Sequence, residues 1–445
     1  MSELTRGEGA RLGARVSRRG FLAGATAAMA APYFVPASVL GAGGRTPPSD
    51  RIRTGHIGIG GMGSGHVGEC LGNPQTQVTA LCDPYYSKRD PWKQRAESRY
   101  AADLGRGTYR GCGSYADFRD VVTRDDVDAV FIASPEFWHA LQSVWAMRNG
   151  KDVYCQKAMT LTVAEGWAVI DTVRRHNRVF QLGTQQRSDR NFRFAAELAL
   201  NGYLGQLKIV KVAVPGGSGG LPVAQPKDPP GDLDYEMWLG PAPWTPYNDQ
   251  KCSFSWYFIN DYCIGWIGSW GVHHIDCALW GTPCFHAGKV EIEGTAQFPT
   301  VGQANDSYSW RVNVVAENGL RMFFTDDGGQ QHGVRFEGDK GWVHVDRGSI
   351  HAEPESLLRI ALKPDDIHLY ESHGHTANFL ECMRTRRDPV ANVEAGHRAT
   401  TMTIICDVAT RIGRKVVWDW QAQRFVGDDV ANGYLRRPMR SPWQL

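Results

Sequence analysis

The sequence lacks several features that would assign a function at once. None of its ten cysteines stands in a C-x-x-C arrangement, and no H-E-x-x-H or similar spacing of histidines is present. The 49 lysines and arginines nearly balance the 47 aspartates and glutamates, so the charge gives no reason to expect nucleic acid or a membrane surface as a partner. There is no fixed-period repeat and no low-complexity tract. The cysteines are therefore interpreted as small buried side chains, and no metal ligand is assigned.

Residues 1–43 have the layout of an export signal followed by a linker. Arg18 and Arg19 precede a weakly apolar run, rich in alanine and glycine, that extends to Ala42. This is the pattern of a twin-arginine signal. Pro32 and Pro36 make the run a poor membrane span, which favours a cleavable signal over an uncleaved anchor. We expect a periplasmic or otherwise exported protein that folds in the reducing cytoplasm before transport.

The rest of the chain divides by its pattern of apolar residues. In residues 50–187 short apolar runs alternate with helical patterns, which predicts an α/β domain with a doubly wound parallel sheet. Residues 188–420 contain a connection rich in glycine and proline and then long alternating runs, which predict an α+β domain with a large, mostly antiparallel open sheet. Such a sheet favours a homo-oligomer. Residues 421–445 are assigned to a C-terminal tail.

A glycine-rich turn begins the first domain. Gly58, Gly60 and Gly63 form G-x-G-x-x-G after a predicted strand and before a predicted helix, where the backbone can approach a pyrophosphate. The next strand ends at Asp83, twenty residues after Gly63. A carboxylate there accepts hydrogen bonds from ribose hydroxyls and repels a ribose phosphate. NAD is therefore expected rather than NADP, and two basic residues shortly after Asp83 weaken that preference.

Four later motifs resemble the Gfo/Idh/MocA oxidoreductase family. They are S-P-E-F-W-H-A at 134–140, Y-C-Q-K-A-M at 154–159, G-T-Q-Q-R-S at 183–188 and S-W-G-V-H-H-I-D at 269–276. The similarity covers nearly the whole chain after the signal, and it is strongest to the exported branch that acts on sugars and includes NAD-dependent glycoside hydrolases. The resemblance implies a Rossmann domain that binds NAD and a second domain that shapes a carbohydrate site.

The resemblance assigns two catalytic residues. The lysine of the family's E-K-P motif falls on Lys157, at the carboxyl edge of the predicted parallel sheet, where burial should help its amine to assist loss of a hydroxyl proton. The family's catalytic histidine falls on His273, which is expected to take a proton near neutral pH. The sequence departs from the family at Gln156 and Ala158, where relatives have glutamate and proline, and at Ser269, where many have a carboxylate.

Binding residues follow from the same motifs and from the aromatic stretch at 255–270. The expected cofactor contacts are Gly58, Gly60, Met62, Gly63, Asp83, Ser134, Pro135, His139, Gln156 and Gln185. The expected contacts to a small carbohydrate or glycoside are Tyr257, Asp261, Trp270, His274 and Asp276. Fifteen tryptophans in the chain, several of them in this stretch, offer apolar platforms for stacking against sugar rings.

Export and NAD dependence agree only if the cofactor stays bound, because free NAD is not expected outside the cytoplasm. Two reactions known in the family return NAD to its starting state. The preferred one is glycoside cleavage by transient oxidation at carbon 3, elimination, hydration and reduction. The alternative is sugar or polyol oxidoreduction with bound NAD(P). The departures at Gln156, Ala158 and Ser269 also leave open a non-catalytic, sugar-binding relative.

Overall fold

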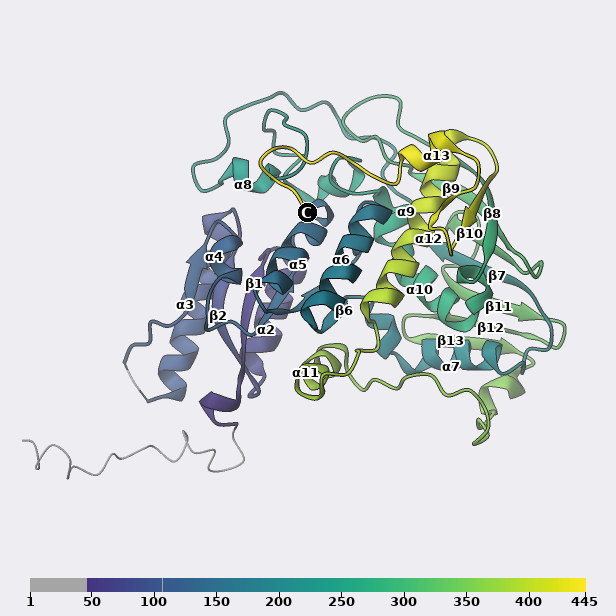
Figure 1. Cartoon of the computed structure of the whole chain (residues 1–445), viewed down its shortest axis with the longest axis horizontal. Coiled ribbons are helices and arrows are strands. Elements are labelled where there is room, and N and C mark those ends of the chain that lie inside the picture. The colour runs from purple at the N-terminus through teal and green to yellow at the C-terminus, as the bar shows by residue number, and fades with distance from the viewer. Residues whose placement is uncertain (1–45, 106) are drawn as a thin grey trace, which may run out of the picture. The chain divides into compact units, whose positions relative to one another are not determined.

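The computed structural model describes residues 46–445 except residue 106 (Figure 1). The expected twin-arginine signal lies outside these described residues. Contacts divide the chain after Arg51. Of the first unit the structure describes only a short end, with a 3-10 turn at Pro48–Asp50, and the second unit spans Ile52–Leu445. No helix in the described part of the chain is both long enough and apolar enough to span a membrane.

A six-stranded parallel sheet begins the second unit, in the order β3-β2-β1-β4-β5-β6. Its strands are β1 (Ile52–Ile57), β2 (Thr76–Cys82), β3 (Gly113–Tyr115), β4 (Ala129–Ile132), β5 (Asp152–Cys155) and β6 (Phe180–Leu182). Its helices are α2 (Gly61–Gly72), α3 (Tyr86–Asp103), α4 (Arg119–Val122), α5 (His139–Arg148) and α6 (Val163–His176). Every residue of β4, β5 and β6 is buried, because helices cover both faces. The predicted doubly wound parallel sheet is confirmed.

A nine-stranded sheet follows, in the order β13-β12-β11-β7-β10-β9-β8-β14-β15. Its strands are β7 (Leu207–Val214), β8 (Lys289–Gln297), β9 (Ser309–Ala316), β10 (Arg321–Asp326), β11 (Gly333–Gly338), β12 (Trp342–Asp346), β13 (Ser349–Glu353), β14 (Val416–Asp419) and β15 (Arg424–Phe425). Within this sheet, among the strands that the structure describes, only β7 and β10 pair in parallel. Buried and exposed residues alternate along most of β8, as expected for a sheet with one covered face. The predicted mostly antiparallel sheet is also confirmed.

The helices after β6 join the two sheets. They are α7 (Arg190–Leu200), α8 (Tyr235–Leu239), α9 (Gly265–Ser269), α10 (Gly271–Gly281), α11 (His375–Thr385), α12 (Val393–Ile412) and α13 (Asp429–Gly433). Helix α12 is buried over most of its length and packs against α6 on one side and against α10 and β8 on the other (Figure 1). One hydrophobic core therefore runs through both sheets.

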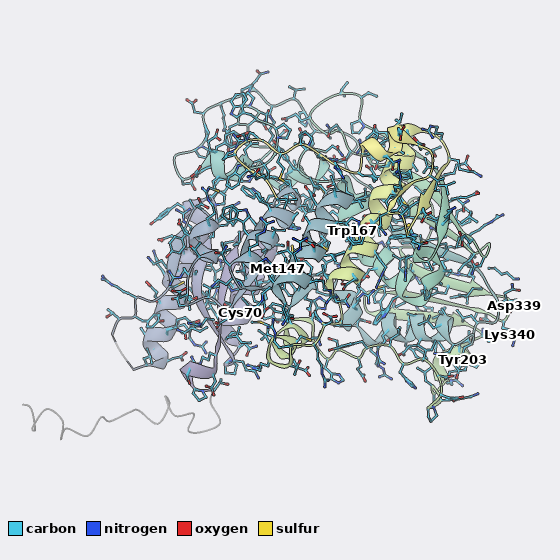
Figure 2. All side chains as sticks on the ribbon, in the orientation of Figure 1. Cys70, Met147, Trp167, Tyr203, Asp339 and Lys340 are labelled. Atoms are coloured by element: carbon cyan, nitrogen blue, oxygen red, sulfur yellow. The ribbon has the colours of Figure 1, made fainter. Side chains whose placement is uncertain are left out.

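All ten cysteines are free thiols. Eight are buried, among them Cys70, which lies within the first half of the structure (Figure 2). Burial raises the pKa of the Cys82 thiol well above its ordinary value, so the thiol stays protonated. The buried cysteines act as small apolar side chains.

The C-terminal residues 421–445 are built into the fold rather than extending from it. Strand β15 adds to the edge of the nine-stranded sheet. Trp443 packs against Trp138 and Phe118 of the first half, with ring centroids 5.0 and 6.1 Å apart. The end of the chain thus ties the second sheet to the first domain.

The turn between β1 and α2 depends on two glycines. Gly58 has a φ of +83°, and a Cβ atom there would lie 2.5 Å from the backbone nitrogen of Ser134. A Cβ atom on Gly63 would overlap the carbonyl oxygen of Gly58. Gly60 and Gly61 instead have no atom within 4 Å of a built Cβ position, so they border open space. The first pair lets the chain pack closely, and the second pair leaves room for a ligand.

We expect Gly63→Ala to lower the free energy of unfolding by about 1–3 kcal/mol, because the added methyl group must displace the β1–α2 turn. Gly65→Ala is the matched control, since Gly65 is exposed in the same helix and nothing lies near its Cβ position. That change should stabilise the protein by about 0.5–1 kcal/mol. Denaturant unfolding of both variants measures the difference, and equal effects would contradict this account of the turn.

Candidate active site

Two cavities meet at Lys157 and Met62, whose side chains line both. The first, of about 480 Å³, begins at the glycine turn and extends along the carboxyl ends of the parallel strands. The second, of about 400 Å³, opens toward the second sheet and is lined also by Gln185, Gln186, Asp189, Phe192, Trp270, His273 and Arg347. Lys157 follows β5 and lines both cavities. Its amine can therefore contact a ligand in either cavity.

The first cavity fits a dinucleotide. Seven of the expected cofactor residues line it: Gly58, Gly60, Met62, Asp83, Ser134, Pro135 and Gln156. The open space at Gly60 lies at the start of the 12-residue helix α2, whose free N–H groups attract phosphate. Of the other expected residues, Gly63 packs beneath the turn, and Gln185 lines the second cavity and donates to the Tyr154 hydroxyl at 3.3 Å.

Asp83 and Gln156 offer acceptors at two places in this cavity. One carboxylate oxygen of Asp83 accepts from the Ile59 N–H at 2.7 Å and the other from the Tyr85 N–H at 2.8 Å. Each oxygen keeps a lone pair for a ribose hydroxyl. Near Lys157, the Nε2 of Gln156 lies 2.7 Å from His66 Nε2, while its buried Oε1 has no partner among the described residues. An unpartnered buried acceptor fits the amide N–H₂ of a nicotinamide.

A segment of the second half, residues 232–257 (the roof segment), covers the first cavity. The Tyr86 N–H donates to the carbonyl of Asp232 at 2.8 Å, and the Asp234 N–H donates to the carbonyl of Pro84 at 3.1 Å. These bonds begin directly after Asp83. Further along, the roof segment lines the cavity with Met237, Trp238, Cys252, Ser253, Phe254, Trp256 and Tyr257. A dinucleotide in this cavity would lie beneath a segment that is bonded to the residues directly after Asp83.

The Lys157 amine is withdrawn from water. Its Nζ donates to Ser269 Oγ at 2.9 Å and lies 5.2 Å from the centre of the Tyr257 ring. Burial lowers the pKa of Lys157, and the nearby carboxylate of Glu136 partly opposes this effect. Ser269 thus accepts a hydrogen bond where many relatives are expected to place a carboxylate. The lowered pKa makes the neutral amine, which can accept a proton, easier to reach.

Glu136 is a site residue that the sequence reasoning missed. Its side chain is only 1 % exposed; one oxygen accepts from the Ala158 N–H at 3.0 Å, and the other lies 3.1 Å from Cys263 Sγ. It supplies a carboxylate near Lys157 although the family's glutamate is replaced by Gln156. The available signal was an acidic residue inside the apolar run S-P-E-F-W-H-A.

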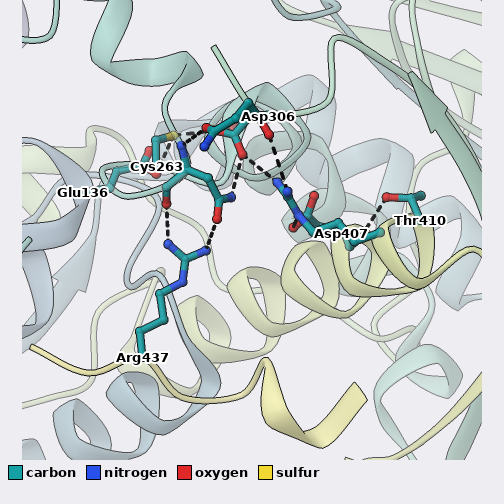
Figure 3. A network of polar contacts seen from close by, with 10 residues as sticks. Glu136, Cys263, Asp306, Asp407, Thr410 and Arg437 are labelled. Carbon is teal, nitrogen blue, oxygen red and sulfur yellow. Dashed lines mark hydrogen bonds and ion pairs between the residues drawn. The ribbon is translucent and has the colours of Figure 1, made fainter. Parts of the chain in front are cut away.

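A polar network lies next to Glu136 and Cys263 (Figure 3). It contains Asp306, which is 2 % exposed and accepts from Asn260 at 2.6 Å and from Arg411 at 2.7 Å. Burial raises the pKa of Asp306 to about 7. Arg411 also binds Asp407, and Arg437 donates to Asn260. The network anchors the loop of Cys263 to α12 and to the C-terminal segment.

His139 positions the cavity wall but does not line either cavity. Its Nδ1 lies 2.6 Å from the carbonyl oxygen of Ala158, and its Nε2 lies 2.9 Å from that of Ser134. Burial lowers its pKa. The neutral imidazole carries one N–H and donates to one of these two carbonyl oxygens at a time. It lies between the loop that carries Ser134 and the loop that carries Lys157, whereas the motif implied a direct cofactor contact.

His273 lines the second cavity together with Lys157, and its Nδ1 has no hydrogen-bond partner among the described residues. Burial lowers its pKa well below 6.5, and the charges of Lys157 and Arg347 lower it further. The imidazole is therefore neutral and weakly basic in this site. The expectation that it takes a proton near neutral pH does not fit this environment, and Lys157 is the stronger base.

The five expected sugar contacts separate in the structure. Trp270 lines the second cavity, and Tyr257 lines the first beside Lys157. Asp261 is exposed and lines neither cavity. His274 is fully buried behind the wall, with its Nδ1 2.9 Å from the carbonyl oxygen of Ala213. Asp276 turns toward another part of the fold.

The placement of Asp276 has a clear physical reason. Its two oxygens accept from Nε and an η nitrogen of Arg187 at 2.7 and 2.8 Å, and both side chains are buried. A buried guanidinium without a counter-charge is costly, so this pair holds α10 against the 3-10 helix Gln185–Ser188. Helical spacing predicted a shared face for His273 and Asp276, and it did not reveal Arg187 as the partner of Asp276.

Two charged residues in the second cavity were also missed. Arg347 stands in the β12–β13 turn, with its guanidinium 4.4 Å from the centre of the Trp270 ring. Asp189 caps α7 by accepting from the Asn191 N–H at 2.8 Å. In the sequence both look like ordinary turn and cap residues. Together they give the cavity a cation beside an aromatic platform and an anion in the same lining, which suits a polyhydroxylated ligand.

Comparison with known proteins identifies both halves. Residues 52–184 match the NAD-binding Rossmann fold of the GFO_IDH_MocA oxidoreductase family, and residues 218–445 match that family's C-terminal alpha/beta domain. A glycosyl hydrolase family 109 protein of Shewanella pealeana is 29% identical over 161 residues, which are 36% of this chain and 34% of that protein. An alpha-N-acetylgalactosaminidase of Shewanella oneidensis is 30% identical over 129 residues, or 29% and 27% of the two chains. The chain therefore spans about a third or less of the length of these relatives.

Solved structures share the fold at lower identity. An aldose-aldose oxidoreductase from Caulobacter crescentus superposes with a TM-score of 0.57 and 18% identity, covering 82% of this chain and 99% of that one. The two matched domains, which together span most of the chain, the parallel sheet with its glycine turn, and the lysine at the junction of two cavities all agree. The chain belongs to the Gfo/Idh/MocA oxidoreductase family.

Proposed function

We propose that this enzyme holds NAD tightly and uses it for redox-neutral chemistry on a carbohydrate, with glycoside cleavage as the preferred reaction. The observation that carries the proposal is the roof segment, which bonds to Pro84 and Tyr86 and encloses the cavity beside Asp83. A cofactor held there would leave only when these contacts open. Slow exchange of the cofactor suits a reaction that regenerates it in each turnover, rather than one that must replace it.

The cofactor would be held by the glycine turn, by Asp83 at the ribose and by Gln156 near Lys157. Asp83 favours NAD, while Lys88, which also lines the cavity, is a cation that would favour a ribose phosphate. NAD bound there would supply reversible hydride transfer at a sugar carbon.

Lys157 acts on the proton of the substrate hydroxyl. Its neutral amine accepts that proton as the carbon becomes a ketone, and its ammonium returns the proton when the ketone is reduced. Ser269 and the ring of Tyr257 fix the direction of the amine. Neutral His273, with an unpartnered ring nitrogen in the same cavity, is placed to hydrogen-bond the substrate.

A ketone at carbon 3 makes the proton on carbon 2 acidic. That proton passes to water, the bond from carbon 1 to the glycosidic oxygen breaks, and the departing oxygen takes up a proton from water to leave as an alcohol. Water then adds to the resulting double bond, and reduction restores the sugar. The names of the two Shewanella relatives favour this sequence of steps.

Two alternatives carry different support. The fold shared with an aldose-aldose oxidoreductase favours a second sugar as the group that restores the cofactor. The replacement of the family's glutamate and proline by Gln156 and Ala158 favours a sugar-binding protein without activity. Lys157→Ala distinguishes the enzyme from the sugar-binding protein. It should abolish activity in an enzyme, whereas a protein without activity has none to lose.

We also propose export by the twin-arginine route, on the basis of Arg18, Arg19 and the run that follows them. Transport of an already folded protein would carry a bound cofactor with it.

Denaturing the purified protein should release close to one equivalent of NAD per chain, because the roof segment retains the cofactor during purification. Chromatography of the released nucleotide gives its amount and oxidation state and distinguishes NAD from NADP. An empty protein that also fails to take up added NAD would rule out the proposed function.

Cleavage of an aryl α-N-acetylgalactosaminide in deuterium oxide should require no added cofactor and should place deuterium at carbon 2 of the released sugar. Mass spectrometry and proton NMR locate the label. Cleavage without the label would exclude elimination, and transfer of oxidation between two aldoses without cleavage would favour the oxidoreductase alternative.

Glu136→Gln should move the rising limb of the pH profile of kcat/KM to lower pH. The neutral amine of Lys157 is the active form, so activity rises as pH passes the pKa of Lys157, and loss of the Glu136 charge lowers that pKa further. Glutamine keeps an acceptor for the Ala158 N–H. Asp171→Asn, which removes an exposed charge on α6, is the control and should leave the profile in place. A shift to higher pH would contradict this assignment of Lys157.

A further inference from the structure

Three side chains on separate elements converge behind the wall of the second cavity. They are His274 on α10, His332 before β11 and Asp346 at the end of β12. The Nε2 of His332 lies 3.6 Å from an oxygen of Asp346, and the Nε2 of His274 lies 4.0 Å from the same oxygen. All three candidate ligand atoms lie within 4.8 Å of one another.

The buried histidine presents a free lone pair to this point. His274 is 0 % exposed, and its Nδ1–H donates to the carbonyl of Ala213 at 2.9 Å. In that tautomer Nε2 carries no proton, and it has no hydrogen-bond partner among the described residues. A ring nitrogen without a proton is the form of histidine that binds a cation.

The outer contacts resemble those that support metal ligands in proteins. A ligating histidine usually donates its second ring nitrogen to a carbonyl or a carboxylate. His274 does so to Ala213. The Nδ1 of His332 makes no hydrogen bond among the described residues, and a carboxylate oxygen of Asp327 lies 3.9 Å from it. His332 and Asp346 are 26% and 29% exposed, which leaves a path for an ion from solvent.

We propose that His274, His332 and Asp346 form a site for a borderline divalent cation, with Zn²⁺ as the preferred ion. Two imidazoles and one carboxylate are a common zinc ligand set, and a water completes a tetrahedron. Tetrahedral coordination places ligand atoms about 3.3 Å apart, so small side-chain movements suffice to close the observed spacings.

This site would stiffen the substrate cavity from behind. Asp346 is followed directly by Arg347, and Trp270, which lines the cavity, packs against both His274 and His332 with ring centroids 5.3 and 5.2 Å apart. The positive charge of Arg347 is directed over the Trp270 ring. A bound cation would join α10, the segment before β11 and the end of β12, and so fix Trp270 and Arg347.

The test is metal binding by the full chain, prepared without a histidine tag and dialysed against a chelator. Titration with Co²⁺ should saturate at one equivalent with visible absorption bands of tetrahedral cobalt, and Zn²⁺ should displace them. His332→Ala and Asp346→Asn should each weaken binding by at least about tenfold, and Asp327→Asn, which keeps all three ligands, by about tenfold. His176→Ala removes an exposed histidine on α6 and should change nothing.

Thermal unfolding gives an independent measurement. Zn²⁺ should raise the Tm of the unchanged protein and of His176→Ala, and it should raise the Tm of the ligand variants much less. Circular dichroism without metal checks that each variant is folded. The proposal would be overturned if the unchanged protein showed no saturable metal binding. It would also be overturned if His332→Ala, Asp346→Asn and Asp327→Asn bound the metal as tightly as the unchanged protein does.

Discussion

A lysine amine withdrawn from water is the constraint on which the candidate site depends. A buried lysine cation without partners would cost folding free energy. The groups around Lys157 offset that cost and still leave an amine that can accept a proton. Ser269 accepts its hydrogen bond, and the carboxylate of Glu136 lies close enough to raise its pKa. Glu136 is itself held by Ala158 and Cys263, so the charge is fixed on both sides.

The same need for fixed geometry explains why the two halves share one core. Lys157 comes from the parallel sheet, Ser269 and His273 come from the segment that packs on the antiparallel sheet, and α12 packs against both. His139 lies between the Ser134 and Ala158 loops, with one ring nitrogen near a carbonyl oxygen of each. A hinge between the halves would separate the amine from its partners.

Features contained within one local unit were readable from the sequence. The turn at Gly58 and the carboxylate at Asp83 belong to a single strand-helix-strand unit, where spacing alone determines what lies together. The pattern of apolar residues likewise predicted both sheets. Strand β3 was not foreseen, because its three residues are only partly buried and carry no apolar run.

Features that depend on distant segments were not readable. Arg347 reaches the site of Lys157 only because the order of the sheet places β12 near α10. Asp276 was predicted to contact the sugar because the sequence did not reveal Arg187 as its partner. The triad of His274, His332 and Asp346 has no sequence spacing of its own. Sequence patterns identify which residues share a face, and tertiary packing decides what that face meets.

The roof segment also dictates an order of assembly. The glycine turn and Asp83 are made early in the chain, whereas residues 232–257 follow only after the whole parallel sheet. During synthesis the glycine turn and Asp83 are therefore complete before the roof segment that covers them. A cofactor retained as proposed would therefore enter before the roof segment closes over the glycine turn.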